Sequence, residues 1–157
     1  IETRTGNSYT KKISYENDYP FGGEYSGHLY FRDKFIGNDD GIYGGLRLVE
    51  ILSNKKTTVS EELKDISVYY SSPEVKLTVE DSKKANIIDR VEEYVKNKGY
   101  TYHTIDGVKV IYPDGFALIR KSNTGPNIIT RYESKDKERL KQIEEEFTSL
   151  LNKLKEE

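Results

Sequence analysis

The sequence predicts an α+β protein in two parts: a partial α/β layer, then a small domain with an antiparallel sheet. Apolar residues recur at every third or fourth position near residues 41–53, 82–98 and 136–156, which is the helical period. Short alternating runs rich in Val, Ile and Tyr lie between the last two helices, separated by Asp-Gly and Asn-Thr-Gly turns. Pro73 in "SSPEVKL" separates the two parts. We therefore expect four to five antiparallel strands with helices on one face of the sheet.

The composition limits the class of protein. A chain of 157 residues forms one ordinary domain or two small ones. Its net charge is −2 with both signs interspersed, so we expect neither a nucleic acid nor a membrane as partner. The absence of cysteine excludes disulfides and thiolate metal sites and fits a cytoplasmic location. The chain starts at Ile1 and lacks methionine, so we expect a piece of a longer polypeptide.

The first part, residues 1–70, is predicted to contain few strands. Its opening "IETRTG" reads as a short strand that ends in a turn at Gly6, followed by a basic helical stretch around Lys11 and Lys12. A glycine-rich loop, residues 22–28, precedes the alternating aromatic run "LYFRDKF", which is typical of a strand.

Two helices are expected to complete the first part. The longer one ends at about Ser53, and its N-cap candidates are Asn38, Asp39 and Asp40. Its predicted buried face has three-and-four spacing and consists of Ile42, Leu46, Val49 and Leu52. Gly45 is expected to permit close approach of a neighbouring element. The shorter helix is predicted to begin at Ser60 and to end near "YYSSP".

The second part, residues 71–157, reads β-α-β-β-β-β-α. The first strand runs through "EVKLTVE", Asp81 or Ser82 is expected to cap the next helix, and Gly99 fits its left-handed C-terminal position. Two strands flank a predicted two-residue turn at Asp106 and Gly107, and "NTG" joins the following two. The last helix has one apolar stripe, formed by Leu140, Ile143, Phe147, Leu150, Leu151 and Leu154.

Three polar side chains alternate in the glycine-rich stretch "GGEYSGH". In an extended backbone Glu24, Ser26 and His28 would point the same way. A carboxylate accepts bonds from vicinal hydroxyls, and a hydroxyl and an imidazole beside it supply further donors, which suits a sugar. Two alternatives stay open: a hairpin tip with scattered polar residues, or His28 as a general acid or base. The other histidine, His103, is read as structural or solvated.

A second polar cluster lies in "RKSNTGPNIITR". Two guanidiniums, two hydroxyls, an amide and the N–H groups of a turn can together surround a phosphate. These candidates are Arg120, Ser122, Asn123, Thr124 and Arg131. The plainer alternative is a polar hairpin with an arginine on each arm. Asp39 and Asp40 are read as a helix N-cap pair rather than as metal ligands.

The stretches "GGEYSGH", "DDGIYGGLRLVEILS" and "DGFALIRKSNTGPNIITRYES", in this order, closely resemble the α-D-phosphohexomutase superfamily, and best its phosphomannomutase/phosphoglucomutase group. The resemblance implies that residues 1–70 are the C-terminal part of domain 3, with a sugar-binding loop at 22–28. It implies that residues 71–157 are a TBP-like domain 4, with a phosphate-binding loop at 120–126. Both clusters above then become substrate contacts: Glu24, Ser26 and His28 for the sugar, and the second cluster for the non-reacting phosphate.

The resemblance also implies a reaction, in which a phosphoryl group moves between C1 and C6 of glucose or mannose through a bisphosphorylated sugar. A phosphoserine in domain 1 and Mg²⁺ held in domain 2 would take part, and this sequence contains neither motif. We therefore expect the chain to bind hexose phosphate, no cofactor of its own and the remaining domains 1–3, and to be inactive alone. Asn7 replaces the histidine of the family's "TGH", which makes it a possible substrate contact. Two alternatives are a freestanding non-catalytic phosphosugar-binding module and a rigid lid without substrate contacts.

Overall fold

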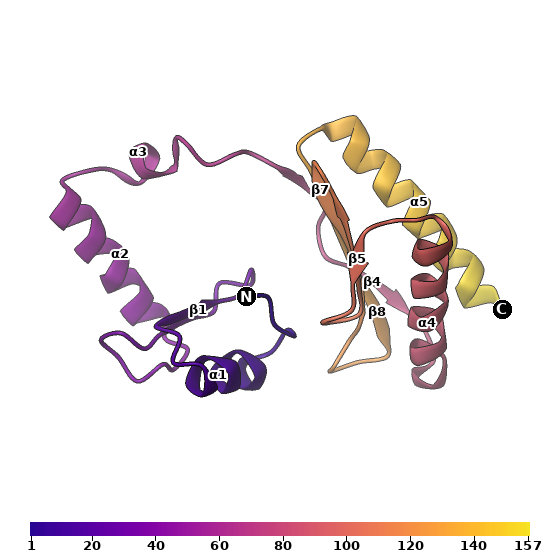
Figure 1. Cartoon of the computed structure of the whole chain (residues 1–157), viewed down its shortest axis with the longest axis horizontal. Coiled ribbons are helices and arrows are strands. Elements are labelled where there is room, and N and C mark those ends of the chain that lie inside the picture. Colours follow the sequence, from indigo (N-terminus) through magenta and orange to yellow (C-terminus); the bar gives the residue numbers. More distant parts are fainter. The chain divides into compact units, whose positions relative to one another are not determined.

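The computed structural model describes residues 1–157, which form two compact units, Ile1–Ile66 and Ser67–Glu157. The sequence places the corresponding division between residues 70 and 71. Figure 1 shows the elements of both units along the chain. No helix is both long enough and apolar enough to span a membrane.

The first unit contains three helices and a short antiparallel ribbon. Its elements are α1 (Asn7–Glu16), β1 (Phe21–Gly23), β2 (Leu29–Phe31), α2 (Gly41–Lys55) and α3 (Val59–Leu63). β1 pairs with β2 in the register Phe21 to Phe31. The helical stretch around Lys11 is confirmed, whereas the strand predicted before Gly6 is wrong, because residues 1–4 pair with no other strand. The strand predicted over "LYFRDKF" is limited to its first three residues.

Helix α2 begins where the sequence predicts but buries a different face. Asp40 caps it by accepting a hydrogen bond from the Tyr43 backbone N–H at 2.9 Å. The predicted buried face is wrong, since Ile42, Leu46 and Val49 are 82%, 61% and 59% exposed. The one fully buried residue of α2 is Gly44.

Contacts with the β1–β2 ribbon and with Phe35, just after it, decide this orientation of α2. The Tyr43 ring stacks on Phe35 at a centroid distance of 4.2 Å and meets Phe31 edge-on at 5.6 Å. One turn later, the Arg47 guanidinium lies over the Phe31 ring at 4.8 Å. A β-carbon at Gly44 would lie 2.9 Å from Leu29 Cδ1, so Gly44, and not the predicted Gly45, permits the close approach.

The second unit is a complete α+β domain. Its elements are β3 (Tyr70–Ser71), β4 (Val75–Thr78), α4 (Asp81–Asn97), β5 (Tyr102–His103), β6 (Val108–Tyr112), β7 (Gly115–Lys121), β8 (Asn127–Ser134) and α5 (Lys137–Glu156). From β4 onward the order is the predicted β-α-β-β-β-β-α. The sheet is antiparallel and follows the path β3-β8-β7-β6-β5, and β4 pairs with the first half of β8. The fold class is confirmed, with six strands instead of four to five because β3 and β4 both pair with β8.

Helices α4 and α5 lie on one face of this sheet and form the core with it (Figure 1). Strand residues two apart point to the same face, so buried residues of β6 and β7 alternate with more exposed ones, whereas Ile128, Ile129 and Thr130 of β8 are all buried. The predicted apolar stripe of α5 supplies Ile143, Phe147, Leu151 and Leu154 to the core. The opposite face of the sheet carries no helix of this unit.

Three local predictions in the second unit have different outcomes. Gly99 adopts the expected left-handed conformation, with φ of 70°. The N-cap of α4 is Glu80, without a side-chain capping bond, so the predicted cap at Asp81 or Ser82 is wrong. The turn before β6 is wider than two residues, because the β5–β6 pairing ends at His103 and Lys109.

Packing against β7 explains that wider turn. Gly107 has φ of 77°, and a β-carbon there would lie 2.3 Å from the Ile119 carbonyl oxygen. Only glycine fits such a backbone contact, so the loop rests on β7 and does not close immediately into a hairpin. This brings Asp106 beside Arg120.

Candidate functional site

The glycine-rich stretch forms the tip of the β1–β2 ribbon. Beyond the last strand pair, the Glu24 N–H donates to the His28 carbonyl at 2.9 Å, and the Gly27 N–H donates to the Glu24 carbonyl at 3.0 Å. The backbone therefore turns here, and the extended conformation assumed for Glu24, Ser26 and His28 is wrong. Ser26 lies exposed at the turn, and Glu24 and His28 lie at its two ends.

Glu24 is held in place by two hydroxyl groups. Its Oε1 accepts a hydrogen bond from Thr10 Oγ1 at 3.3 Å and one from the Tyr30 hydroxyl at 3.2 Å. Tyr30 is fully buried, and burial, followed by the nearby Glu24 charge, raises the pKa of Tyr30 to about 12. Tyr30 therefore remains a donor at neutral pH. Both bonds end on Oε1, which leaves Oε2 for the donor of a ligand.

His28 has a partner that sequence reasoning missed. Its Nδ1 lies 2.6 Å from Asp39 Oδ2, and the His28 side chain is 50% exposed. The predicted cap pair therefore divides: Asp40 caps α2, and Asp39 orients the imidazole. Because Asp39 engages Nδ1, Nε2 is the ring nitrogen that can exchange a hydrogen bond with another group. A helix needs only one N-cap residue, so the sequence already indicated that either Asp39 or Asp40 would be available for another contact.

Helix α1 contributes to the same tip through Thr10, which no local sequence pattern marked. Thr10 is buried, and its hydroxyl reaches Glu24, 14 residues away in the sequence. Asn7 is the first residue of α1, and its side chain is exposed. The first unit thus gathers Glu24, His28 and Ser26 on one hairpin tip, with Asn7 on the helix that contacts Glu24.

In the second unit, Arg120 of β7 and Arg131 of β8 lie on the sheet face opposite the helices. Arg120 pairs with Ile129, and Arg131 pairs with Leu118, so the two arginines are diagonal neighbours across the strands. Their sequence neighbours Ile119 and Tyr132 point into the core. The structure therefore brings both predicted arginines together.

The guanidinium of Arg120 is largely withdrawn from water and lies between two carboxylates. Its side chain is 11% exposed, and its nitrogens lie 3.9 Å from Glu74 Oε2 and 3.9 Å from Asp106 Oδ2. These distances exceed the roughly 2.7–2.9 Å of a charge-assisted hydrogen bond. Asp106 was read from the sequence only as a turn residue, and the structure assigns it to the surroundings of Arg120.

Backbone hydrogen bonds and Lys84 of α4 close the turn between β7 and β8. Lys84 donates to the Ser122 and Gly125 carbonyls. The Ser122 N–H donates to the Asn127 carbonyl at 2.8 Å, and Ser122 Oγ accepts from the Thr124 N–H at 3.3 Å. Ser122 is buried, whereas Asn123 and Thr124 are exposed. The Ser122 hydroxyl therefore stabilises the turn, whereas the side chains of Asn123 and Thr124 are exposed to solvent.

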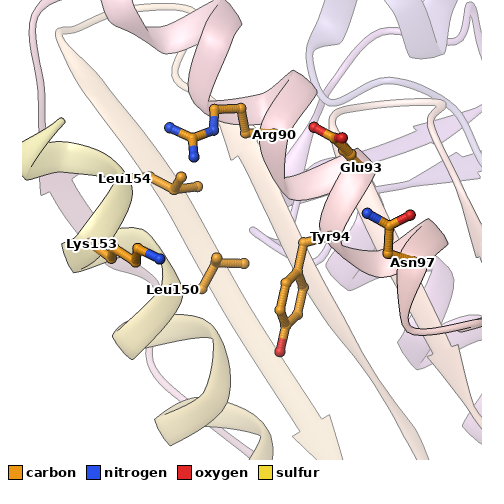
Figure 2. A pocket seen from close by; sticks show the side chains of 7 residues that line it. All are labelled: Arg90, Glu93, Tyr94, Asn97, Leu150, Lys153 and Leu154. Carbon is orange, nitrogen blue, oxygen red and sulfur yellow. The ribbon is translucent and has the colours of Figure 1, made fainter.

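A shallow groove of about 190 Å³ lies elsewhere, between α4 and α5 (Figure 2). Its lining residues are Arg90, Glu93, Tyr94, Asn97, Leu150, Lys153 and Leu154. Because α4 and α5 cover one face of the sheet and Arg120 and Arg131 lie on the other, this groove is separate from the predicted cluster. No group of three or more His, Cys, Asp or Glu side chains gathers in the structure to hold a metal ion.

Comparison with family models matches both units. Residues 1–69 match the model described as "Phosphoglucomutase/phosphomannomutase, alpha/beta/alpha domain III". Residues 74–150 match the model described as "Phosphoglucomutase/phosphomannomutase, C-terminal domain".

Individual relatives carry the same names. A phosphomannomutase/phosphoglucomutase of Pseudomonas syringae pv. tomato is 36% identical over 151 residues, which cover 96% of this chain and 32% of the relative. A phosphoglucomutase of Neisseria meningitidis serogroup A is 35% identical over 153 residues, with 96% and 33% covered. A crystal structure of a phosphoglucomutase/phosphomannomutase family protein from Burkholderia thailandensis matches with a TM-score of 0.82 and 36% identity. That match covers 98% of this chain and 32% of the other.

The chain thus spans about a third of the length of the curated relatives it matches. The two matched segments together leave only residues 70–73 and 151–157 outside the models. The first polar cluster lies in the first matched segment, and the second cluster lies in the second. The chain belongs to the phosphoglucomutase/phosphomannomutase family, of which it carries residues of domain III and of the C-terminal domain.

Proposed function

We propose that this chain is the substrate-binding C-terminal portion of a phosphomannomutase/phosphoglucomutase. The whole enzyme would interconvert hexose 1-phosphate and hexose 6-phosphate through a bisphosphorylated sugar. The observation that carries the proposal is the family match of both units, each of which holds one of the two polar clusters. The names of the relatives favour glucose and mannose phosphates as substrates.

The hairpin tip of the first unit would bind sugar hydroxyls. Glu24 is suited to this because Thr10 and Tyr30 fix its Oε1 while Oε2 can accept from a hydroxyl. Ser26 and His28 would add hydrogen bonds from the same tip, and Asp39 would keep Nε2 of His28 directed at the ligand. Asn7 would donate a further hydrogen bond to the substrate. Its side-chain amide can donate in place of the histidine imidazole found at this position of the family motif.

The second unit would bind the phosphate that does not react. Arg120 and Arg131 share one sheet face and supply positive charge, while Asn123 and Thr124 extend donors from the turn. Ser122 would act mainly through the shape of the turn. A phosphate dianion beside Arg120 can form the short charge-assisted bonds that Glu74 and Asp106 do not make at 3.9 Å.

Phosphoryl transfer itself would need groups outside this chain. Asp39 and Asp40, the acidic pair most like a metal site, are engaged with His28 and with the cap of α2. The residues here therefore do not fit Mg²⁺, and we assign the metal and the phosphoryl donor to the rest of the enzyme. What this chain supplies is positioning, which lowers the entropy lost at the reacting step.

Titration of the chain with glucose 6-phosphate, followed by NMR, tests the phosphate site. Arg120→Ala removes a charge-assisted contact worth about 1.5–3 kcal/mol, so we expect the affinity to fall about 10- to 150-fold. Lys141→Ala on α5 removes one charge from the helix face, and we expect it to leave the affinity unchanged. Equal affinity of Arg120→Ala and wild type would contradict the proposal and favour the rigid-lid alternative.

A freestanding phosphosugar-binding module is the second candidate, since the chain holds both binding clusters and neither transfer motif. The mass of the natural gene product separates the two. A product near 18.1 kDa supports the module, and one about three times larger supports the enzyme. Turnover of glucose 1-phosphate by this chain, with a bisphosphate primer present, would contradict both.

A further inference from the structure

We propose that Lys84 of α4 is a positioning residue for the phosphate-binding turn between β7 and β8. It holds two carbonyl groups of that turn inward, which leaves the backbone N–H groups of Asn123 and Gly125 to donate to the ligand. Lys84 lies 38 and 41 residues from the groups it contacts, and no sequence pattern links it to them. The identity of the anion rests on the proposed function, whereas the contacts of Lys84 do not.

The contacts of Lys84 use its full donor capacity. Its Nζ donates to the Ser122 carbonyl at 3.2 Å and to the Gly125 carbonyl at 3.0 Å, and it lies 2.7 Å from Asp81 Oδ1. An ammonium group has three protons and no acceptor, so these partners satisfy it completely. The side chain is 15% exposed, and hydrogen bonds this far from water are stronger than exposed ones.

Other backbone bonds complete the inward orientation of the turn's carbonyl groups. The Pro126 carbonyl accepts from the Val79 N–H at 2.9 Å, and the Asn127 carbonyl accepts from the Ser122 N–H at 2.8 Å. Carbonyl oxygens repel a phosphate, so tying them to the body of the domain removes that repulsion. The N–H groups of Ser122, Thr124 and Asn127 are bound within the turn, so those of Asn123 and Gly125 are the ones that can donate to an anion.

The charge of Lys84 acts in the same direction. The ammonium lies behind the turn and adds positive potential where a dianion would bind. Asp81 opposes this only in part, because its side chain is 74% exposed and water screens its charge. Lysine suits the position because a compact ammonium with three donors meets two carbonyls and a carboxylate at once. α4 is itself part of the core, so Lys84 also fixes the turn relative to the sheet.

The experiment compares three variants of the chain with wild type by NMR, at a temperature where all four are folded. Each is titrated with inorganic phosphate and with glucose 6-phosphate, and amide exchange is measured at Asn123, Thr124, Gly125 and Asn127. Lys84→Met removes the donors at similar length, and we expect about tenfold weaker affinity for both ligands and faster exchange in the turn. Lys83→Met, the adjacent lysine on the same helix, removes the same charge and is expected to match wild type. Lys84→Arg restores charge and donors and is expected to recover part of the affinity.

The outcomes separate this inference from the proposed function. If wild type binds both ligands and Lys84→Met binds them equally well, the role of Lys84 is overturned and the phosphate site stands. If Lys84→Met and Lys83→Met weaken binding equally, the effect is one of net charge, and the positioning role is again overturned. If wild type binds neither ligand, the proposed function fails first and the role of Lys84 in phosphate binding fails with it. Recovery by Lys84→Arg supports the inference, because a loss due only to helix stability would not return with a guanidinium.

Discussion

The two units differ sharply in how they bury their apolar side chains. The second unit has a continuous core between α4, α5 and a six-stranded sheet, with Phe147, Val91 and Ile143 fully buried. In the first unit Tyr30 is the only large apolar side chain that is fully buried. Both units contain helices with apolar stripes, so the difference does not come from the helical pattern. It comes from the sheet, because two strands of three residues offer too little surface to cover a helix.

Because the ribbon of the first unit is so small, the apolar side chains of α2 remain largely exposed. Its exposed apolar side chains are Ile42, Leu46, Leu48, Val49 and Ile51. Large exposed apolar patches are typical of interaction sites. The family model that matches this unit describes an alpha/beta/alpha domain, in which a sheet lies between helical layers. In the structure, α2 contacts the ribbon through Tyr43, Gly44 and Arg47. Its other printed contacts are mostly ion pairs with charged loop and α3 residues, and they leave these apolar side chains exposed.

The largest effect expected is a contrast between identical substitutions in the two units. Leu151→Ala in α5 removes a side chain that is 3% exposed, and we expect it to lower the free energy of unfolding by about 2–5 kcal/mol. Leu46→Ala in α2 removes one that is 61% exposed, and we expect a change below about 0.5 kcal/mol. Urea unfolding followed by circular dichroism measures both. Comparable losses for the two variants would show that α2 is covered in solution.

Two glycines with positive φ sharpen the comparison at the level of the backbone. A β-carbon at Gly107 meets β7 backbone, so Gly107→Ala is expected to destabilise by about 2–3 kcal/mol, the upper range for local backbone strain. At Gly27, with φ of 89°, a β-carbon meets nothing within 4 Å. Gly27→Ala should therefore lose only the left-handed penalty of about 1 kcal/mol. Thermal unfolding of both variants is the measurement, and a larger loss at Gly27 would contradict the packing described for Gly107.

The caps of α2 and α5 test whether the loss of one helix-capping bond destabilises a whole unit or only one helical turn. Asp40 and Asp136 each accept a hydrogen bond from the third helical residue, at 2.9 and 2.8 Å. Replacement of either by Ala is expected to remove about 1 kcal/mol. In α5 the loss should appear in the unfolding of the whole second unit, and in α2 as faster amide exchange in its first turn alone. Site-resolved hydrogen exchange distinguishes these, and global destabilisation by Asp40→Ala would contradict the comparison.

Alkaline pH should give the smallest effect, and mainly in the second unit. Burial, followed by hydrogen bonding to Glu146, raises the pKa of Tyr94 from 10.0 to about 12, and the same causes raise the pKa of Tyr100. Below pH 10 both the folded and the unfolded chain keep these protons. Above pH 10 the unfolded chain releases these protons, while the folded chain retains that of Tyr94 up to about pH 12, so the free energy of unfolding falls as the pH rises.

Urea unfolding of wild type and Tyr94→Phe at pH 8 to pH 12 tests this dependence. The variant should lose less stability over that range than wild type, because it has no proton to retain at this position. In the first unit the corresponding group is Tyr30 alone, whose pKa is also raised to about 12. A pH dependence that is unchanged in Tyr94→Phe would contradict the assignment.

Local patterns predicted most of the second unit. The alternation of "VKVIY" and "NIITRYES" identified β6 and β8, and the apolar spacing identified α4 and α5. Asp40, the observed cap of α2, is one of the three predicted N-cap candidates, and the predicted start of the last helix near residue 136 coincides with its cap Asp136. Periodicity and capping depend on residues a few positions apart, so a sequence contains the information needed to predict them. The strand predicted before Gly6 failed because strands also need a pairing partner.

The sequence by itself determined where the long helices and most strands of the second unit lie, and which residue types could bind a sugar or a phosphate. The tertiary structure alone decided which faces are buried and which side chains meet. Asp39 meets His28, Thr10 meets Glu24, and Lys84 meets the turn after β7 across 11, 14 and about 40 residues of sequence. The physical reason is one of range: hydrogen bonding and periodicity along the backbone are local, whereas packing and charge pairing depend on chain segments that only the fold brings together.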